Sequence, residues 1–118
     1  MRLRRTIRIA SAAALLTTAP LFGHHSFKAQ YDENQTIMLS GTVTKVTWTN
    51  PHVRVYLDVK DGEAKGNWEL ELASPNGLMS KGWKVDSLRT GSHIAMSGYP
   101  ARDGSHLANA RKVTVTQR

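Results

Sequence analysis

Hydrophobic and polar residues alternate along several segments of this chain. Residues 36–49 are TIMLSGTVTKVTWT, residues 52–59 are HVRVYLDV, and residues 67–73 are NWELELA. Because successive side chains of a β-strand point to opposite faces, this period of two predicts a strand in each segment. In the third segment it places Glu69 and Glu71 on the outward face, where we expect both carboxylates to be solvated.

Turn signals separate these strands from one another and from two later ones. Asn-Pro at 50–51 and Asp-Gly at 61–62 follow the first two strands, and SPNG at 74–77 predicts one or two helical turns that begin near its proline. Residues 93–99 and 106–116 predict the last two strands. Three strands, a short helix and two more strands indicate an all-β fold, a small five-stranded Greek-key barrel of the OB type.

The N-terminal segment has a different composition. Four arginines precede the apolar stretch IASAAALLTTAPLF and a short exit of small and turn-forming residues. This layout is typical of a secretory signal peptide, so we expect Sec-type export to the periplasm and cleavage after Gly23, with Ala19 as the alternative site. A retained N-terminal anchoring helix is the remaining interpretation. The expected organisation is a signal peptide at 1–23, an N-terminal arm at 24–35 and the barrel at 36–118.

The charge of the chain depends on that signal peptide. The formal net charge is +7, but four of the sixteen basic residues lie before residue 9. The remaining twelve basic and nine acidic residues give +3, so no nucleic-acid partner is expected. No apolar run reaches the roughly 18–20 residues that cross a bilayer, and cysteine is absent, which excludes a disulfide or thiolate site.

The sequence carries no motif of an enzyme. It contains no nucleophile elbow, no glycine-rich phosphate loop before a helix and no H-E-x-x-H pair. We therefore expect a monomeric, non-enzymatic binding protein.

Several blocks of the chain resemble a known family. They are HHSF at 24–27, YD at 31–32, SGTVTKVTWTNPHV at 40–53, the ELASP stretch with GW at 82–83, LRTG at 88–91 and SGYPARDGS at 97–105. They resemble DUF6152, an uncharacterised family of exported bacterial proteins, and the resemblance covers essentially the whole mature chain. It implies an exported single-domain OB-like barrel, and it names no activity. The strand order is also similar to that of periplasmic OB-barrel copper chaperones, but their ligand spacing is not matched here.

Three histidines are the candidate metal ligands. Imidazole suits copper and zinc, and cleavage after Gly23 would let His24 bind through its α-amine and its ring together. His25 is its neighbour, and His52 lies at a turn where it can close a site if the N-terminal arm folds back. We expect a bound metal ion as cofactor, with copper preferred over zinc. The alternative is that all three are solvated or make ordinary hydrogen bonds.

The WTNPH block offers a second candidate site. Trp48, Asn50 and His52 can line a cleft at the rim of the barrel and bind a protein partner or an envelope polysaccharide. The alternative interpretation is architectural, with the tryptophan covering one end of the barrel and the Asn-Pro pair fixing the turn. A role as an accessory subunit of a periplasmic redox enzyme is a third possibility.

Methionines provide a weaker indication of copper. Met38 and Met96 lie on predicted strands and Met79 lies in the short helix. Thioethers favour Cu(I), but an isolated methionine on a strand is more often part of the core. We expect these three side chains to fill the core.

Overall fold

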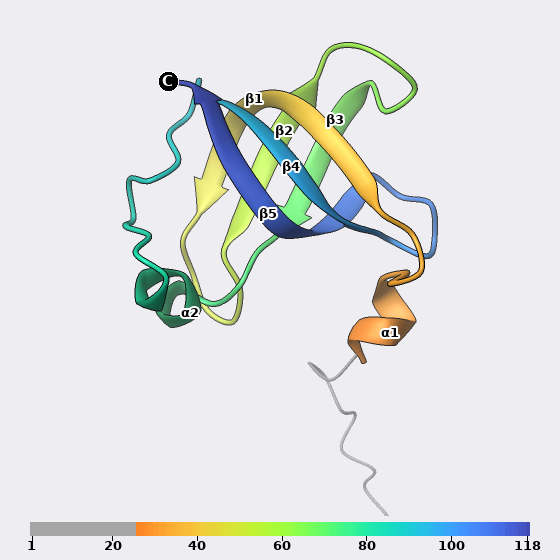
Figure 1. Cartoon of the computed structure of the whole chain (residues 1–118), viewed down its shortest axis with the longest axis horizontal. Coiled ribbons are helices and arrows are strands. Elements are labelled where there is room, and N and C mark those ends of the chain that lie inside the picture. Colours follow the sequence, from red (N-terminus) through yellow and green to blue (C-terminus); the bar gives the residue numbers. More distant parts are fainter. Residues whose placement is uncertain (1–25) are drawn as a thin grey trace, which may run out of the picture.

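The computed structural model describes residues 26–118 (Figure 1). Its elements in chain order are α1 (Phe27–Gln30), β1 (Ile37–Thr47), β2 (Arg54–Val59), β3 (Gly66–Glu71), α2 (Pro75–Ser80), β4 (His93–Pro100) and β5 (Leu107–Gln117). Within this described part of the chain, no helix is long and apolar enough to cross a bilayer.

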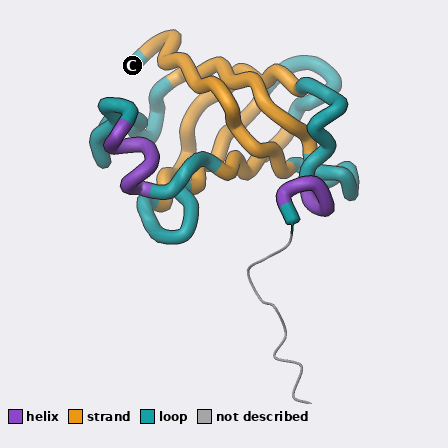
Figure 2. Tube along the Cα trace, turned by 60° about the horizontal axis from the view of Figure 1, so that its bottom comes forward, coloured by secondary structure: helices purple, strands orange, loops and turns teal. Residues whose placement is uncertain are grey.

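The five strands form a closed barrel in the order β1-β2-β3-β5-β4, with both short helices outside it (Figure 2). Every neighbouring pair is antiparallel except β3 and β5, which are parallel. The helix α2 lies between β3 and β4 in the sequence, and Ser74 caps it by accepting a hydrogen bond from the Gly77 amide. The predicted all-β, OB-like barrel with one short helix between the third and fourth strands is confirmed.

The core follows the alternation in β2 and β3. Val55 and Leu57 of β2 and Leu70 of β3 are each at most 1 % exposed. Trp68 is also buried, and its indole nitrogen donates a 2.7 Å hydrogen bond to the Ala64 carbonyl oxygen. Burial of these alternate side chains removes apolar surface from water, which is the main force that holds a barrel without disulfides together.

Strand β1 contains one irregularity in its pairing with β2. The register shifts between Val43 and Lys45. At Gly41 a Cβ atom would lie 2.3 Å from the Asp58 carbonyl oxygen. The glycine therefore permits close approach of β1 and β2, and the bulge is placed by the barrel's curvature further along the strand.

Residues 26–35 form a strap attached to the outside of the barrel, which we call the N-terminal strap. Ser26 caps α1 by accepting a hydrogen bond from the Ala29 amide. The strap then pairs with the β4–β5 connection, since the Asp32 amide donates to the Pro100 carbonyl oxygen at 3.0 Å and Tyr31 forms a bridge with Ala101. This pairing positions Tyr31, which is fully buried.

Candidate functional site

The parallel pairing of β3 and β5 is short. It covers only three residue pairs and ends at Glu71 opposite Asn109. Beyond that point the chain after β3 leads into α2, while β5 continues beside β4. A cavity of about 410 Å³ lies at this divergence. We call it the Glu71 cavity; the strap, the β1–β2 loop, the end of β3, Lys81 and β5 line it.

Glu71 is buried on the outer side of the barrel. Its neighbour Leu70 points into the core, so Glu71 points outward, as the alternation predicts. The expectation that it is solvated is wrong, because only 8 % of the residue is exposed. Its Oε2 accepts hydrogen bonds from the Tyr31 hydroxyl at 2.9 Å and from Arg54 Nη2 at 3.3 Å. Tyr31 belongs to the N-terminal strap, so the strap covers the Glu71 carboxylate.

Arg54 lies between the two carboxylates of β3 and donates a hydrogen bond to each. Its Nη1 donates to Glu69 Oε1 at 3.2 Å, and Nη2 donates to Glu71 Oε2. The hydroxyl of Tyr56 also donates to Glu69 Oε1, at 3.2 Å. A buried carboxylate is tolerated when it is paired with a cation and hydrogen-bonded, and Arg54 with Tyr31 meets both conditions for Glu71.

His52 faces Glu71 with one ring nitrogen. Its Nδ1 lies 3.0 Å from the Leu72 carbonyl oxygen, which can only accept a hydrogen bond, so Nδ1 carries a proton. In the neutral ring the lone pair is therefore on Nε2, which lies 3.9 Å from Glu71 Oε1. The side chain of His52 is 44 % exposed, and that of Glu71 is 10 % exposed. This edge of the site is open to ligands.

The environment of Glu71 also changes the titration of its tyrosine partner. Burial raises the pKa of Tyr31 well above its usual value, and the hydrogen bond to the Glu71 carboxylate raises it further. Tyr31 is therefore a neutral hydrogen-bond donor at all ordinary pH values. Partial desolvation and the nearby Glu69 carboxylate raise the pKa of Tyr56 in the same direction.

Asn109 completes the buried polar groups around the cavity. The residue is 8 % exposed, and its Nδ2 donates a 3.4 Å hydrogen bond to the Glu71 carbonyl oxygen. Its Oδ1 is sealed from solvent and has no hydrogen-bond partner among residues 26–118. Buried polar atoms almost always have a hydrogen-bond partner, so this oxygen is an acceptor that a further donor or a cation could satisfy.

The structure brings one of the predicted site residues to this cavity. His52 lines it, whereas Trp48 packs partly buried against the core and Asn50 is exposed outside it. His24 and His25 lie outside the described residues. Between Ser26 and the C-terminus, no group of three or more His, Asp or Glu side chains is arranged to hold a metal ion.

The methionines are spread over different environments. Met96 is buried in the core as expected. The same expectation is wrong for Met38 and Met79, which are 79 % and 47 % exposed. None of the three lines the Glu71 cavity.

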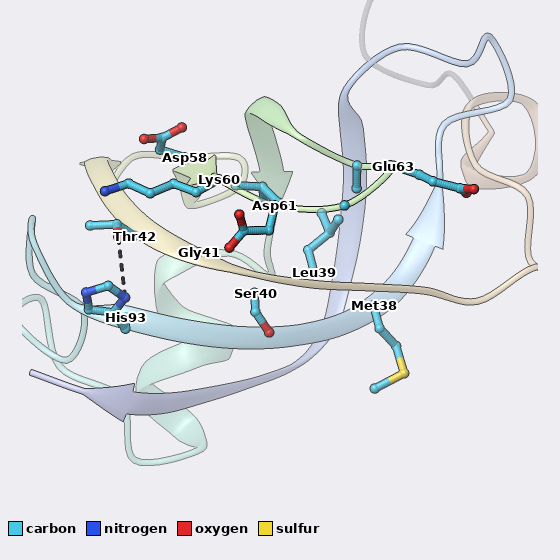
Figure 3. Close-up of a pocket in the computed structure, with 13 residues that line it drawn as sticks. Met38, Leu39, Ser40, Gly41, Thr42, Asp58, Lys60, Asp61, Glu63 and His93 are labelled. Carbon is cyan, nitrogen blue, oxygen red and sulfur yellow. Dashed lines mark hydrogen bonds between the residues drawn. The ribbon is translucent and has the colours of Figure 1, made fainter.

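A larger cavity, of about 670 Å³, is lined by β1, by the end of β2 with the loop that follows it, and by His93 (Figure 3). Figure 3 shows His93 and Met38 at opposite ends of it, in agreement with the pairing of Met38 with Ser97, four residues from His93. The His93 ring is in contact with Thr42 Oγ1 at 3.4 Å. Among the described residues, no buried polar atom that lines this cavity lacks a hydrogen-bond partner.

Sequence comparison now identifies the family. The model of the Family of unknown function (DUF6152) matches residues 12–110. The chain belongs to this family. No curated protein matches the DUF6152 chain in sequence.

Solved structures show the same fold as this DUF6152 chain. The mitochondrial single-stranded DNA binding protein Rim1 from S. cerevisiae superposes with a TM-score of 0.55 at 6 % identity, over 71 % of this chain and 95 % of Rim1. The ZRD-deleted mutant of TiaS, in complex with agmatine, gives 0.54 at 18 % identity, over 73 % of this chain and 22 % of TiaS. At such identities the likeness is one of fold alone.

Sequence reasoning did not assign three residues of the Glu71 cavity to a site. Tyr31 lies in a segment where hydrophobic and polar residues do not alternate. Asn109 lies in a predicted strand, but the sequence does not show which strand pairs with it. Glu71 was noticed, but its pattern was the same as that of the half-exposed Glu69. No local signal distinguishes the two carboxylates, because Tyr31, which covers Glu71, lies forty residues earlier in the chain.

Proposed function

We propose that this protein is an exported, non-enzymatic periplasmic binding protein that holds a transition-metal ion, copper before zinc. Its ligands are His52 and the histidine pair His24-His25 near the new N-terminus. The observation that carries the proposal is the His52 ring, whose Nε2 presents its lone pair to the Glu71 cavity while Nδ1 is held by a backbone carbonyl. A metal-binding histidine typically uses its second ring nitrogen in this way.

Chain connectivity supports the contribution of the N-terminal pair. Phe27 of α1 lines the same cavity as His52. His25 directly precedes Ser26 and His24 is one residue further, so His24 Cα is within roughly 7 Å of Ser26 Cα. Both histidines therefore directly precede the strap in the sequence. The residues from Ser26 onward offer too few ligands for a closed site, and the pair would supply the others.

Cleavage after Gly23 strengthens the proposed site. The free α-amine of His24 and its imidazole then form a chelate before any other residue contributes. The basic and apolar layout of residues 1–23 supports both the export and this cleavage.

Mass spectrometry of the exported protein in its native state is the first test. One spectrum gives the mature N-terminus and any bound metal, and we expect His24 as the first residue. Calorimetric titration with Cu(II) then measures affinity, with an expected dissociation constant of at most about 1 μM. His24→Ala and His52→Ala should each weaken binding, whereas His93→Ala, at the far cavity, should not. Absence of Cu(II) binding in the mature protein would reject the proposal.

A second candidate function uses the rim of the barrel. Trp48 is only partly buried and Asn50 is exposed beside it, which supports a contact with a protein partner or an envelope polysaccharide. Capture of a partner from periplasmic extract that depends on Trp48 and survives chelators would favour this function over metal binding.

Binding of single-stranded DNA is not proposed. That activity belongs to Rim1 by its name, and the two proteins share a fold at 6 % identity. The chain after residue 23 carries only +3. The exposed aromatic side of β2 is moreover engaged, because the Tyr56 hydroxyl donates to Glu69 and Lys45 lies over its ring.

A further inference from the structure

Glu71 uses only one of its two carboxylate oxygens within the described structure. Oε2 accepts the hydrogen bonds of Tyr31 and Arg54. Oε1 accepts no hydrogen bond from residues 26–118, and it faces His52 Nε2 at 3.9 Å. This distance is too long for a hydrogen bond. In the neutral His52 ring, Nε2 carries a lone pair, so two atoms with lone pairs lie opposite each other at the mouth of the cavity.

We propose that Glu71 is a metal ligand through Oε1, beside His52 Nε2, and that the site takes a divalent ion, Cu(II) or Zn(II), instead of Cu(I). The proposal rests on the metal-binding function proposed above and adds a ligand and an oxidation state to it. Two ligands at the usual 2.0–2.2 Å from one tetrahedral metal lie roughly 3.4 Å apart. A movement of about 0.5 Å by the half-exposed His52 ring therefore brings the pair to coordination distance.

The ligand chemistry favours a divalent ion. Imidazole nitrogen and carboxylate oxygen suit Zn(II) and Cu(II), while thioether and thiolate sulfur select Cu(I). The protein has no cysteine, and Met38, Met79 and Met96 all lie away from this cavity. A negatively charged oxygen next to the metal also favours the ion of higher charge.

The surrounding residues position the carboxylate for this role. Tyr31 and Arg54 hold Oε2, so the group cannot rotate freely and Oε1 remains directed at His52. Such contacts behind a ligand fix its orientation. Asn109, on the neighbouring strand, adds a second buried oxygen without a partner among the described residues.

The chain provides a matched control for the test. Glu69 lies two residues earlier on β3, is also bound to Arg54, and does not line the cavity. Glu71→Gln and Glu69→Gln each remove one negative charge and one half of the Arg54 pairing. Only Glu71→Gln removes the charged oxygen that faces His52.

The experiment measures Zn(II) and Cu(II) affinity of the mature protein and of both variants by competition with chromophoric chelators. We expect Glu71→Gln to weaken binding at least about tenfold and Glu69→Gln to change it by less than about twofold. Cu(I) affinity should be insensitive to both substitutions. A folded Glu71→Gln variant that binds within twofold of the unmodified protein would overturn the role of Glu71 and leave the proposed function standing.

A second measurement does not depend on the folding of a variant. X-ray absorption at the zinc edge of the unmodified protein should show nitrogen and oxygen ligands only. Scattering from sulfur, or a preference for Cu(I) over Cu(II), would overturn the proposed ligand set. If the unmodified protein binds neither ion, the proposed function and this inference fail together, and that result is distinct from a failure of Glu71 alone.

Discussion

The Tyr31 hydroxyl donates a 2.9 Å hydrogen bond to Glu71 Oε2, across forty residues of sequence. The tyrosine is fully buried and belongs to the N-terminal strap, while the glutamate ends β3. This contact joins the strap to the barrel and buries the carboxylate next to His52. Four predictions follow from the fold and from the proposed site.

Tyr31→Phe removes the hydroxyl but keeps the buried ring. Because the lost hydrogen bond is to a charged group, the free energy of unfolding should fall by about 1.5–3 kcal/mol in urea titrations. Tyr99→Phe is the control, since the Tyr99 ring packs edge-on against Phe27 and its hydroxyl makes no hydrogen bond within residues 26–118. Equal stability of the two variants would contradict the importance of the Tyr31 contact.

Alkaline pH should destabilise the protein through Tyr31. Burial and the Glu71 hydrogen bond raise its pKa in the folded state, whereas the unfolded chain releases this proton near pH 10. The stabilisation is complete below pH 10 and decreases as the pH rises above it. The slope should be up to about 1.4 kcal/mol per pH unit from this group.

Denaturant titrations between pH 9 and pH 12 measure that slope. Other tyrosines and lysines titrate in the same range, so the quantity of interest is the difference between the unmodified protein and Tyr31→Phe. The variant should lose stability less steeply. Parallel slopes would show that Tyr31 titrates normally.

Gly98→Ala should disrupt the pairing of β4 and β5. A Cβ atom at this position would lie only 1.9 Å from the Asn109 carbonyl oxygen, which is backbone and cannot move aside. We expect a loss of about 3 kcal/mol or more, measured by thermal unfolding. Ser97→Ala, one residue earlier, should cost less than about 1 kcal/mol, and a similar loss in both variants would contradict the steric argument.

Metal binding should raise the free energy of unfolding with the logarithm of the free metal concentration, once that concentration exceeds the dissociation constant. At a free metal concentration 100 times the dissociation constant, the free energy of unfolding should increase by about 2.7 kcal/mol. EDTA should reverse the increase, and His52→Ala should greatly reduce it. His93→Ala should retain it, because that residue lies at the other cavity, so loss of the effect there would argue against the His52 site.

Local sequence patterns were enough to predict the strands and the OB-like barrel. Alternation placed Val55, Leu57 and Leu70 inward, and all three are buried, because a period of two is a local property of extended chain. The turn signal at residues 74–77 placed α2 correctly for the same local reason.

The surroundings of each outward residue depend on contacts that local patterns do not predict. Glu69 and Glu71 have the same local pattern, yet only Glu71 is covered by the strap and faces His52. The bulge between Val43 and Lys45 and the close approach at Gly41 depend on how β1 curves against β2. Burial, charge pairing and the orientation of His52 arise from contacts between segments distant in the chain. Local alternation carries no information about such contacts.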